Sequence, residues 1–487
     1  MAEIEFTQIL DQKKPAVMAE TDWFGGANGL PDSSKKLVLL GASANFNNTL
    51  REVTSIAKGI TDYVEGSPMA CMIEAALKTN PKVPLYALSY PAGTVSALLD
   101  VTMAGTSTAA GVLKVWIGGR LLRVSLASGS TSAAAATAIV AQYTADAYNF
   151  PAAITAGAAS HFVATAVVLG LAGASIRVRV DCSGTPGLTA DTGPGALAIS
   201  EAPLAAGGGT DADPATALAT LQGDDTYELF ALGSQDATPI ASCVTHNDFM
   251  AAPAVWKPGR TVVGWTGNSA TAQTQADTSS NMRIEIVHHE NSPRPCFEVA
   301  AAAAAAYAAN DIRKSADDLP LNWLMPQFLQ TDWPTDAEQE SDLNQGVTPL
   351  YSKRLGNKVM VVRSVHTLHG ASLNNNMAED TRILEISDYV KKSVISAFSG
   401  YKGAILKTES AAGLPGTLTP GRATSILAGR LQQLDSRDYI QGVATAAKAG
   451  EIVAQQNGDN VDRVDCAYPL NATRSAHLIA IKETYTF

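Results

Sequence analysis

The sequence predicts a multi-domain α/β protein whose core has a parallel-type sheet and is interrupted by a β-rich insertion. Two observations carry this prediction: apolar strands alternate with helices on either side of residues 94–203, and the composition changes within that segment. The chain has 487 residues, which suggests about three domains at roughly 100 to 200 residues each. Hydrophobic residues make up 46% and charged residues 17%, so the chain is expected to fold.

The first 35 residues predict a short strand followed by an irregular tether. Ile4, Phe6 and Ile9 alternate weakly, and residues 24–31 are rich in glycine and have no helical period. Such a segment has no helical apolar face to bury in a core of its own. Residues 1–35 are therefore expected either to be disordered or to add their strand to another sheet.

The α/β core is predicted to consist of residues 36–93 and 204–350. Its apolar runs are typical of strands buried on both faces, and the stretches between them have helical spacing. The first unit has expected strands at 36–41 and 83–89 and helices at 51–59 and 69–77. After residue 204, helices are expected at 213–221, 239–250 and 297–309, and strands at 226–231, 260–265 and 282–288. The alanines of the last helix favour close backbone packing because they hold no bulky side chain between elements.

Residues 94–203 are predicted to form the inserted β-rich domain. Small residues and Thr and Val dominate this segment, which carries five basic and five acidic side chains. Gly118 and Gly119 lie between the apolar stretches 111–117 and 120–126, which is a tight-hairpin signal. Further strands are expected at 164–169 and 175–180, with one helix at 131–142.

Residues 351–475 are predicted to form an α+β domain, and residues 476–487 a terminal strand. Pro420 suits the first turn of a helix, and Thr419 before it is a suitable N-cap. The last twelve residues are apolar and β-prone, so their strand must pair in its own domain or be donated elsewhere. The other elements expected here are a strand at 358–365, helices at 381–399 and 420–434, and a strand near Ile440.

The net charge of −11 is unevenly distributed along the chain. Residues 1–349 hold 19 basic and 34 acidic side chains, whereas residues 350–487 hold 16 and 12. No cluster of Lys and Arg suits phosphate contacts, so a nucleic-acid binder is not expected. A diffuse basic zone surrounds the expected helix at 420–434, and either a plain surface helix or a helix that docks on an acidic protein surface would explain it. Its members are Lys402, Lys407, Arg422, Arg430 and Arg437.

Cysteine usage and the N-terminal sequence favour a protein that is neither exported nor anchored in a membrane. The five cysteines include no CxxC pair, so a disulfide framework or a zinc module is not expected. The N-terminus lacks the basic and apolar regions of a signal peptide. The apolar run at 299–309 is far shorter than the roughly 20 residues that a bilayer requires.

No catalytic, cofactor-binding or metal-binding site is predicted. The sequence has no GxSxG, GxxxxGK or GxGxxG motif. His288 and His289 are adjacent on a strand and point to opposite faces, so they are expected to be solvated histidines at a strand end. His366 and His369 are expected in a loop. The acidic runs at 317–318 and 332–342 lack the central glycine of a calcium loop and are expected to be solvated loops.

The order of these segments resembles that of the contractile tail sheath proteins of Mu-like bacteriophages and of contractile bacteriocins. The resemblance covers nearly the whole chain and lies in the overall pattern, with no short signature. The segments that carry it are residues 37–41, 66–70, 80–87, 109–119, 225–230, 300–309 and 359–367.

This resemblance implies a structural protein, with no enzymatic activity, whose α/β core is subtilisin-like in fold alone. Subunits would stack as hexameric rings around a tail tube and contract to drive the tube through the host envelope for genome ejection. Terminal arms would link neighbours by strand addition, through Ile4, Phe6, Ile9, Leu478, Ile479, Ile481 and Tyr485. The C-terminal domain would face the tube, with its basic zone toward an acidic wall.

The partners implied are further copies of the chain, the tail tube protein, the baseplate and the tail terminator, without cofactors, nucleic acid or membrane. The location implied is the virion tail, assembled in the bacterial cytoplasm. The alternatives are another phage tail structural protein, such as a baseplate or bacteriocin sheath component, and an unrecognised α/β hydrolase.

Overall fold

The computed structural model describes residues 35–146, 148–193, 195–205, 209–223, 227–353, 358–369, 380–401, 403–407, 417–458 and 462–473. Within these ranges the chain forms two compact units, one up to Leu384 and the other from Glu385 onward. The terminal segments that the sequence predicts as arms lie outside the described residues.

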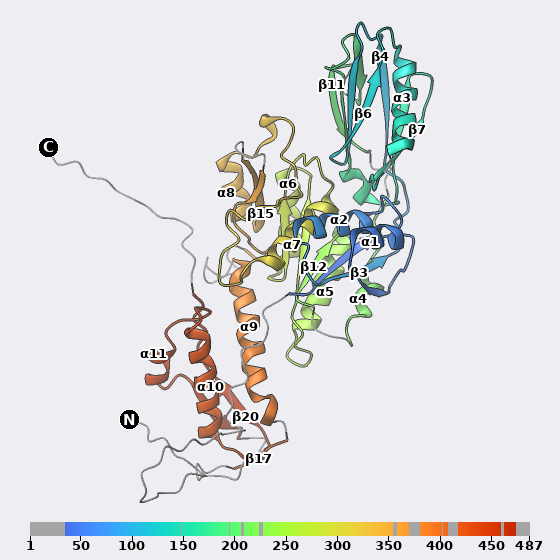
Figure 1. Cartoon of the computed structure of the whole chain (residues 1–487). Helices are drawn as coiled ribbons and strands as arrows, with labels where there is room; N and C mark the ends of the chain where they lie inside the picture. The colour runs from blue at the N-terminus through green and yellow to red at the C-terminus, as the bar shows by residue number, and fades with distance from the viewer. Residues whose placement is uncertain are drawn as a thin grey trace, which may run out of the picture. The chain divides into compact units, whose positions relative to one another are not determined.

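The larger unit is built on an eight-stranded sheet whose six central strands are parallel (Figure 1). Only the two edge strands run antiparallel to their neighbours. The predicted parallel-type sheet of an α/β protein is therefore confirmed. The strands, in spatial order, are β16 (Lys358–Val361), β15 (Val347–Lys353), β14 (Ile284–His288), β13 (Arg260–Trp265), β12 (Leu229–Leu232), β1 (Leu37–Ala42), β3 (Leu85–Tyr90) and β2 (Leu50–Glu52).

Helices cover both faces of this sheet because alternate side chains of its strands point to opposite sides. Leu37 and Leu39 of β1 belong to one apolar cluster, and Val38 and Leu40 belong to the other. The first cluster includes α1 (Ile56–Tyr63), α2 (Pro68–Thr79) and α7 (Cys296–Ala309). The second includes α4 (Ala215–Ala219), α5 (Ala237–Ala251) and α6 (Ser269–Ser279).

The alanine-rich helix α7 packs as closely against the sheet as its sequence predicts. Every residue from Cys296 to Tyr307 is buried. A Cβ added to Gly264 of β13 would lie 2.0 Å from the carbonyl oxygen of Cys296 and 2.8 Å from the amide nitrogen of Ala300. The missing side chain of Gly264 and the small side chains of α7 thus allow the backbones of the two elements to come into contact.

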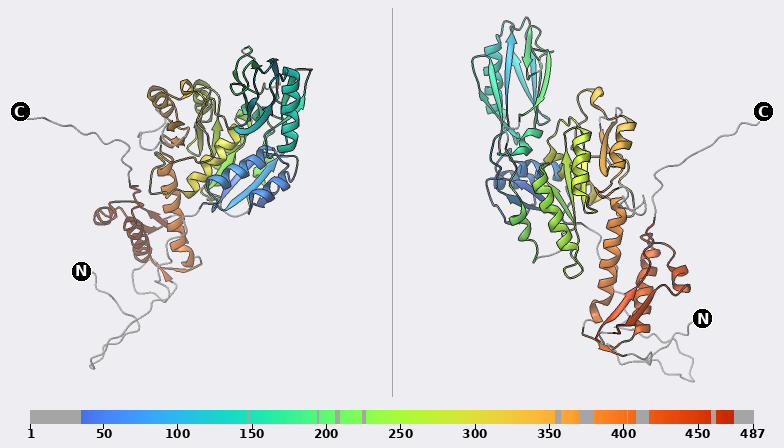
Figure 2. Two further views of the ribbon diagram at one scale, coloured as in Figure 1. Left: turned by 45° about the horizontal axis from the view of Figure 1, so that its top comes forward. Right: turned by 180° about the vertical axis from the view of Figure 1, so that it is seen from behind.

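Residues 98–203 form two four-stranded antiparallel sheets and one long helix, α3 (Ser132–Asp146) (Figures 1 and 2). One sheet has the order β10 (Leu188–Asp191), β4 (Leu98–Gly105), β8 (His161–Ala166) and β7 (Ala152–Ala156). The other has the order β11 (Ile199–Pro203), β9 (Arg177–Asp181), β5 (Gly111–Ile117) and β6 (Arg120–Leu126). Gly118 and Gly119 join β5 to β6 with φ angles of 53° and 74°, as the hairpin prediction requires. A 3₁₀ turn, η1 (Leu171–Ser175), precedes β9.

The smaller unit contains two long helices and two short sheets. Helix α9 (Thr381–Phe398), which belongs to this unit from Glu385 onward, is followed by η5 (Ser399–Tyr401), and α10 (Pro420–Asp435) by α11 (Val443–Lys448). The pair β17 (Ile405–Leu406) and β18 (Thr417–Leu418) is parallel, and the pair β19 (Val453–Gln456) and β20 (Val464–Ala467) is antiparallel. Thr419 caps α10, as predicted, by accepting a hydrogen bond from the amide of Arg422.

The strand expected near Ile440 is reduced to a single β-bridge between Ile440 and Ala472. Two other predictions of secondary structure are wrong. Residues 51–59 do not form one helix, because β2 pairs with the edge of the sheet before α1 begins at its own N-cap, Ser55. The acidic run at 332–342 is not a loop: after η2 (Gln330–Asp332), it contains most of helix α8 (Asp336–Asn344). Thr335 and Glu338 form a capping box that starts this helix.

Candidate assembly surfaces

The sequence predicted two kinds of assembly residue, and the structure describes only part of them. Ile4, Phe6 and Ile9 and the C-terminal set from Leu478 to Tyr485 lie outside the described residues, as does Lys402. Lys407, Arg422, Arg430 and Arg437 lie in the smaller unit.

The described basic residues of the smaller unit differ in their surroundings. Lys407 and Arg437 are exposed. Arg422 is half-buried, and its guanidinium lies 5.4 Å from the centre of the Tyr401 ring. Arg430 is buried on the apolar side of α10, so its side chain does not belong to an exposed basic face. The reason is its spacing from Leu427, Leu431 and Leu434, which places it on the same side of the helix.

The hairpin of β19 and β20 has one covered edge and one open edge within the described part of the chain. The amide of Ala454 in β19 donates a hydrogen bond to Oγ1 of Thr424 in α10, so the helix covers the outer edge of β19. The amide of Asn457 donates across the hairpin to the carbonyl of Arg463. No other described strand pairs with β20.

The register of this hairpin identifies the groups on the open edge. Asn457 bonds across to Arg463, and Gln455 lies opposite Asp465 two residues farther along, so these positions form the hydrogen-bonded pairs. Val464 and Cys466 occupy the alternate positions, and their amide and carbonyl groups therefore point away from β19. An edge of this kind is a template for one more strand.

A hollow of about 750 Å³ lies beside β20. Val464 and Cys466 share a face of the hairpin with Gln456 and line this hollow. Its lining combines aromatic and aliphatic side chains near the ends of α9, β17 and β18 with polar groups, which make up about half of its surface. The lining residues are Phe398, Tyr401, Gly403, Ala404, Leu406, Leu418, Gln456, Asp462, Val464 and Cys466. The open edge and the hollow together suit an added strand with large apolar side chains on one face.

The predicted solvated histidines are in fact buried. His288 and His289 are 4% and 1% exposed, because β14 is an interior strand and α8 packs against its neighbour β15. His288 contacts Asp342 of α8, and burial lowers the pKa of His289 to about 4. His366 and His369 lie in an irregular segment, as predicted, and His366 is buried.

Groups suited to ligand chemistry are scarce in the described ranges. Among those residues, no three His, Cys, Asp or Glu side chains are placed to hold a metal ion. None of the helices found there is both long and apolar enough to cross a bilayer. All five cysteines are free, and only Cys466 is exposed.

Comparison with solved structures relates this architecture to known assemblies. The helical sheath of the anti-feeding prophage in its contracted state aligns with a TM-score of 0.50 and 11% identity, covering 98% of this chain and 100% of that one. The chain has the fold of a contractile sheath protein. A sheath tail protein from Listeria innocua aligns with a TM-score of 0.49 at 15% identity, covering 92% of this chain and 93% of that one. One from Desulfitobacterium hafniense has a TM-score of 0.47 at 14% identity, covering 91% and 93%.

The likeness to sheath proteins lies in the three-dimensional fold. No family model matches the sequence, and no curated protein matches it. Sequence reasoning also missed the open edge of the sheath fold's β19–β20 hairpin. The only signal for that hairpin was the alternation of Val464 and Cys466 with Asp465 in β20, which is too short to stand out in a sequence.

Proposed function

We propose that this chain is the structural subunit of a contractile tail sheath, with an architectural and not an enzymatic role. The observation that carries the proposal is the shared fold, which extends over 98% of the chain and the whole of a sheath subunit from a contractile particle. In this proposal, copies of the chain stack as hexameric rings around a tail tube. Contraction drives the tube through the host envelope for genome ejection.

The particle we propose is a phage tail of the Mu-like kind, assembled in the bacterial cytoplasm, with the tail tube, baseplate and tail terminator as further partners. The eight-stranded sheet corresponds in this proposal to the subtilisin-like core of sheath proteins, residues 94–203 to a protruding domain, and residues 351–475 to the layer that faces the tube. The net charge of +4 for residues 350–487 supports this last assignment if the tube wall is acidic.

Strand addition at the β19–β20 hairpin is the proposed link between neighbours. The open edge offers the main-chain groups of Val464 and Cys466, and the hollow beside it offers apolar side chains such as Phe398 and Leu418. Ile4 and Phe6 are two residues apart, so in an extended strand both side chains would face that hollow. The main-chain hydrogen bonds of such a link persist while subunits rotate, which lets a lattice contract without dissociating.

Electron microscopy of the purified chain tests this function. We expect the full chain to form long striated tubes. Deletion of residues 1–12 or of residues 476–487 is expected to leave a folded monomer that forms none. If either deletion variant formed normal tubes, the assignment of that segment as a subunit-linking arm would be wrong.

Two matched variants of the N-terminal arm distinguish the loss of its apolar face from the general effect of changing its sequence. Replacing Ile4, Phe6 and Ile9 by serine is expected to abolish tubes. Replacing Glu3, Glu5 and Gln8 by serine keeps the apolar face and is expected to preserve them. If the full chain yields only discrete rings, a baseplate component becomes the better assignment.

A further inference from the structure

A buried arginine from the inserted sheets reaches into the α/β core. Arg120 follows the Gly118–Gly119 turn at the start of β6. Its Nη2 lies 2.7 Å from Oε2 of Glu74 on α2, and its Nη1 lies 2.5 Å from Oε1 of Glu298 on α7. All three side chains are at most 9% exposed. One guanidinium thus joins the insert to two helices that are far apart in the sequence.

Each of the two carboxylates also has further hydrogen-bond partners. Oε2 of Glu298 accepts hydrogen bonds from Nε1 of Trp323 at 2.6 Å and from Nη1 of Arg294 at 3.4 Å. Oε2 of Glu74 also accepts one from Nδ2 of Asn149 at 2.8 Å. Two arginines therefore face two glutamates, which leaves the cluster neutral. A neutral cluster tolerates burial better than an unpaired charge because no charge in it is left uncompensated.

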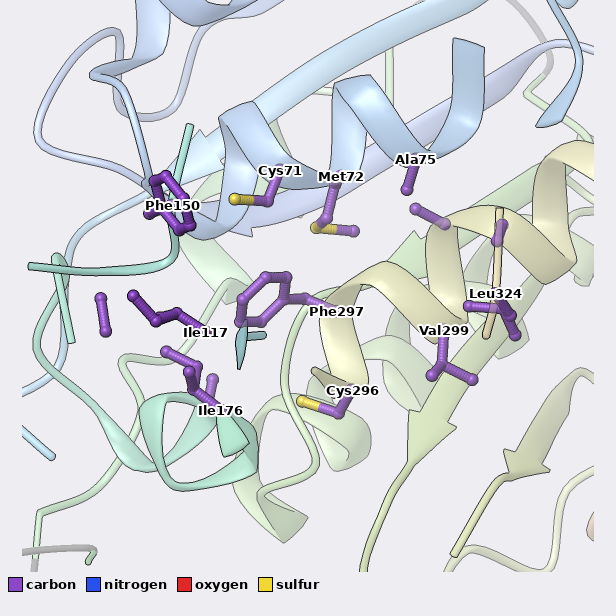
Figure 3. Packing of buried hydrophobic residues seen from close by; sticks show 14 of the residues in the cluster. Cys71, Met72, Ala75, Ile117, Phe150, Ile176, Cys296, Phe297, Val299 and Leu324 are labelled. Atoms are coloured by element: carbon purple, nitrogen blue, oxygen red, sulfur yellow. The ribbon is translucent and has the colours of Figure 1, made fainter. Parts of the chain in front are cut away.

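Apolar side chains from the insert and the core form one continuous layer beside this cluster. Figure 3 shows Ile117, Phe150 and Ile176 of the insert next to Cys71 of α2 and Phe297 of α7. All five are buried and belong to the same hydrophobic cluster. The hydrophobic core of the insert is therefore continuous with that of the α/β core.

The sheet that contains β5 and β9 makes further contacts with the α/β core, which widen this junction. Trp116 of β5 meets Phe328 edge to face, with 5.4 Å between the ring centres. The guanidinium of Arg179 in β9 lies 4.4 Å from the centre of the same Phe328 ring. Nη1 of Arg177 donates a hydrogen bond to Oδ1 of Asn291 at 3.0 Å.

We propose that the inserted domain and the α/β core are one rigid body and that Arg120 is the residue that fixes their relative orientation. A rotation of the insert relative to the core would pull the guanidinium away from the two carboxylates and leave Glu74 and Glu298 buried without it. It would also open the shared apolar layer. If the chain forms a sheath as proposed, any movement of the core during contraction carries the insert with it.

Distance measurement between two spin labels within one full-length chain tests this proposal whether or not the chain assembles, so its failure would not affect the sheath proposal. Labels are attached to cysteines introduced by Ala127→Cys in the insert and Lys82→Cys in the core, with Cys466→Ser to remove the exposed native thiol. Labelled chains are diluted with unlabelled chains to suppress distances between molecules. The test variant is Arg120→Lys, which keeps the charge but loses the planar fork. The control is Arg123→Lys, at an exposed position of the same strand.

We expect a single narrow distance distribution for the background chain and for Arg123→Lys. Arg120→Lys is expected to broaden the distribution about twofold or more, because one ammonium cannot hold both carboxylates in the same geometry. A broad distribution in the background chain would overturn the proposal of a rigid body, whatever the variant does. A narrow distribution in a folded Arg120→Lys chain would overturn the role of Arg120.

Discussion

Nδ1 of His288 lies 2.7 Å from a carboxylate oxygen of Asp342, although 54 positions separate the two residues in the sequence. Their side chains are 4% and 2% exposed, and Nε2 of His288 also contacts the carbonyl of Gly267 at 2.9 Å. Burial alone would lower the pKa of His288, but the hydrogen bond and charge of Asp342 raise it above its ordinary value. Burial would likewise raise the pKa of Asp342, and His288 holds it below its ordinary value. The pair therefore joins the end of β14 to α8 as a buried ion pair.

The first prediction is that Asp342→Asn destabilises the larger unit most in mildly acidic solution. The raised pKa of His288 contributes stability that is complete below about pH 6.5 and is lost as the pH rises through the folded-state pKa. The lowered pKa of Asp342 contributes stability that is present above about pH 4 and is lost on further acidification. We expect a loss of about 3 kcal/mol in urea unfolding near pH 5.5, and a smaller loss near pH 9.

Histidine side-chain NMR provides the direct control for this pair. Asp342→Asn is expected to lower the pKa of His288, and a double-mutant cycle with His288→Gln is expected to give a coupling energy of about 1 kcal/mol or more. An unchanged His288 titration in Asp342→Asn would show that the carboxylate is not what raises the pKa.

The second prediction concerns His289, whose burial has the opposite effect on stability. Because its pKa is lowered to about 4, it contributes stability that is present above about pH 6.5 and is lost as the pH falls toward 4. When the pH falls from 7 to 5, the free energy of unfolding is expected to decrease in both chains. We expect this decrease to be about 2 kcal/mol smaller in His289→Gln than in the parent chain. The control is His161→Gln, whose side chain is 28% exposed on the insert. If the free energy of unfolding had the same pH dependence in the parent chain and in His289→Gln, this prediction would be contradicted.

These histidines show what the sequence could not provide. The apolar run before His288 predicted strand β14 correctly. The burial of His288, its last residue, depends on a helix about 50 residues later in the sequence. That helix, α8, was missed because its exposed face is acidic and few of its residues are apolar. Thr335 and Glu338 carry the capping-box pattern that would have identified its start.

Elements with strong local signals were predicted well, and sites built from distant residues were not. The β5–β6 hairpin needed only two glycines between apolar strands, and α10 needed only Thr419 and Pro420. Arg120 offered no such signal, because its partners Glu74 and Glu298 come from helices 46 and 178 positions away. The open edge of β20 also depends on α10 covering the opposite edge of the hairpin.

The third prediction uses glycines in two different environments. Gly264→Ala would place a methyl group 2.0 Å from the Cys296 carbonyl, so strand β13 and helix α7 must separate. We expect it to destabilise the larger unit by about 3 kcal/mol. In contrast, a Cβ at Gly429 of α10 meets nothing within 4 Å. Gly429→Ala is expected to stabilise the smaller unit by about 1 kcal/mol, through helix propensity. Thermal unfolding of both variants checks whether the first loses and the second gains stability. An unchanged stability of Gly264→Ala would refute the close packing.

The last prediction separates folding of the β19–β20 hairpin from its use as an acceptor of strands. The amide of Cys466 points to the open edge, so Cys466→Pro removes a donor for an added strand while the hairpin keeps its own hydrogen bonds. We expect this variant to melt within a few degrees of the parent and to form no tubes. Cys466→Ala removes only the thiol and is expected to assemble normally. Asp465→Pro removes a donor that points to β19, so it is expected to lower the melting temperature of the smaller unit itself. Tubes formed by Cys466→Pro at the parent's frequency would show that β20 is not the edge at which subunits join.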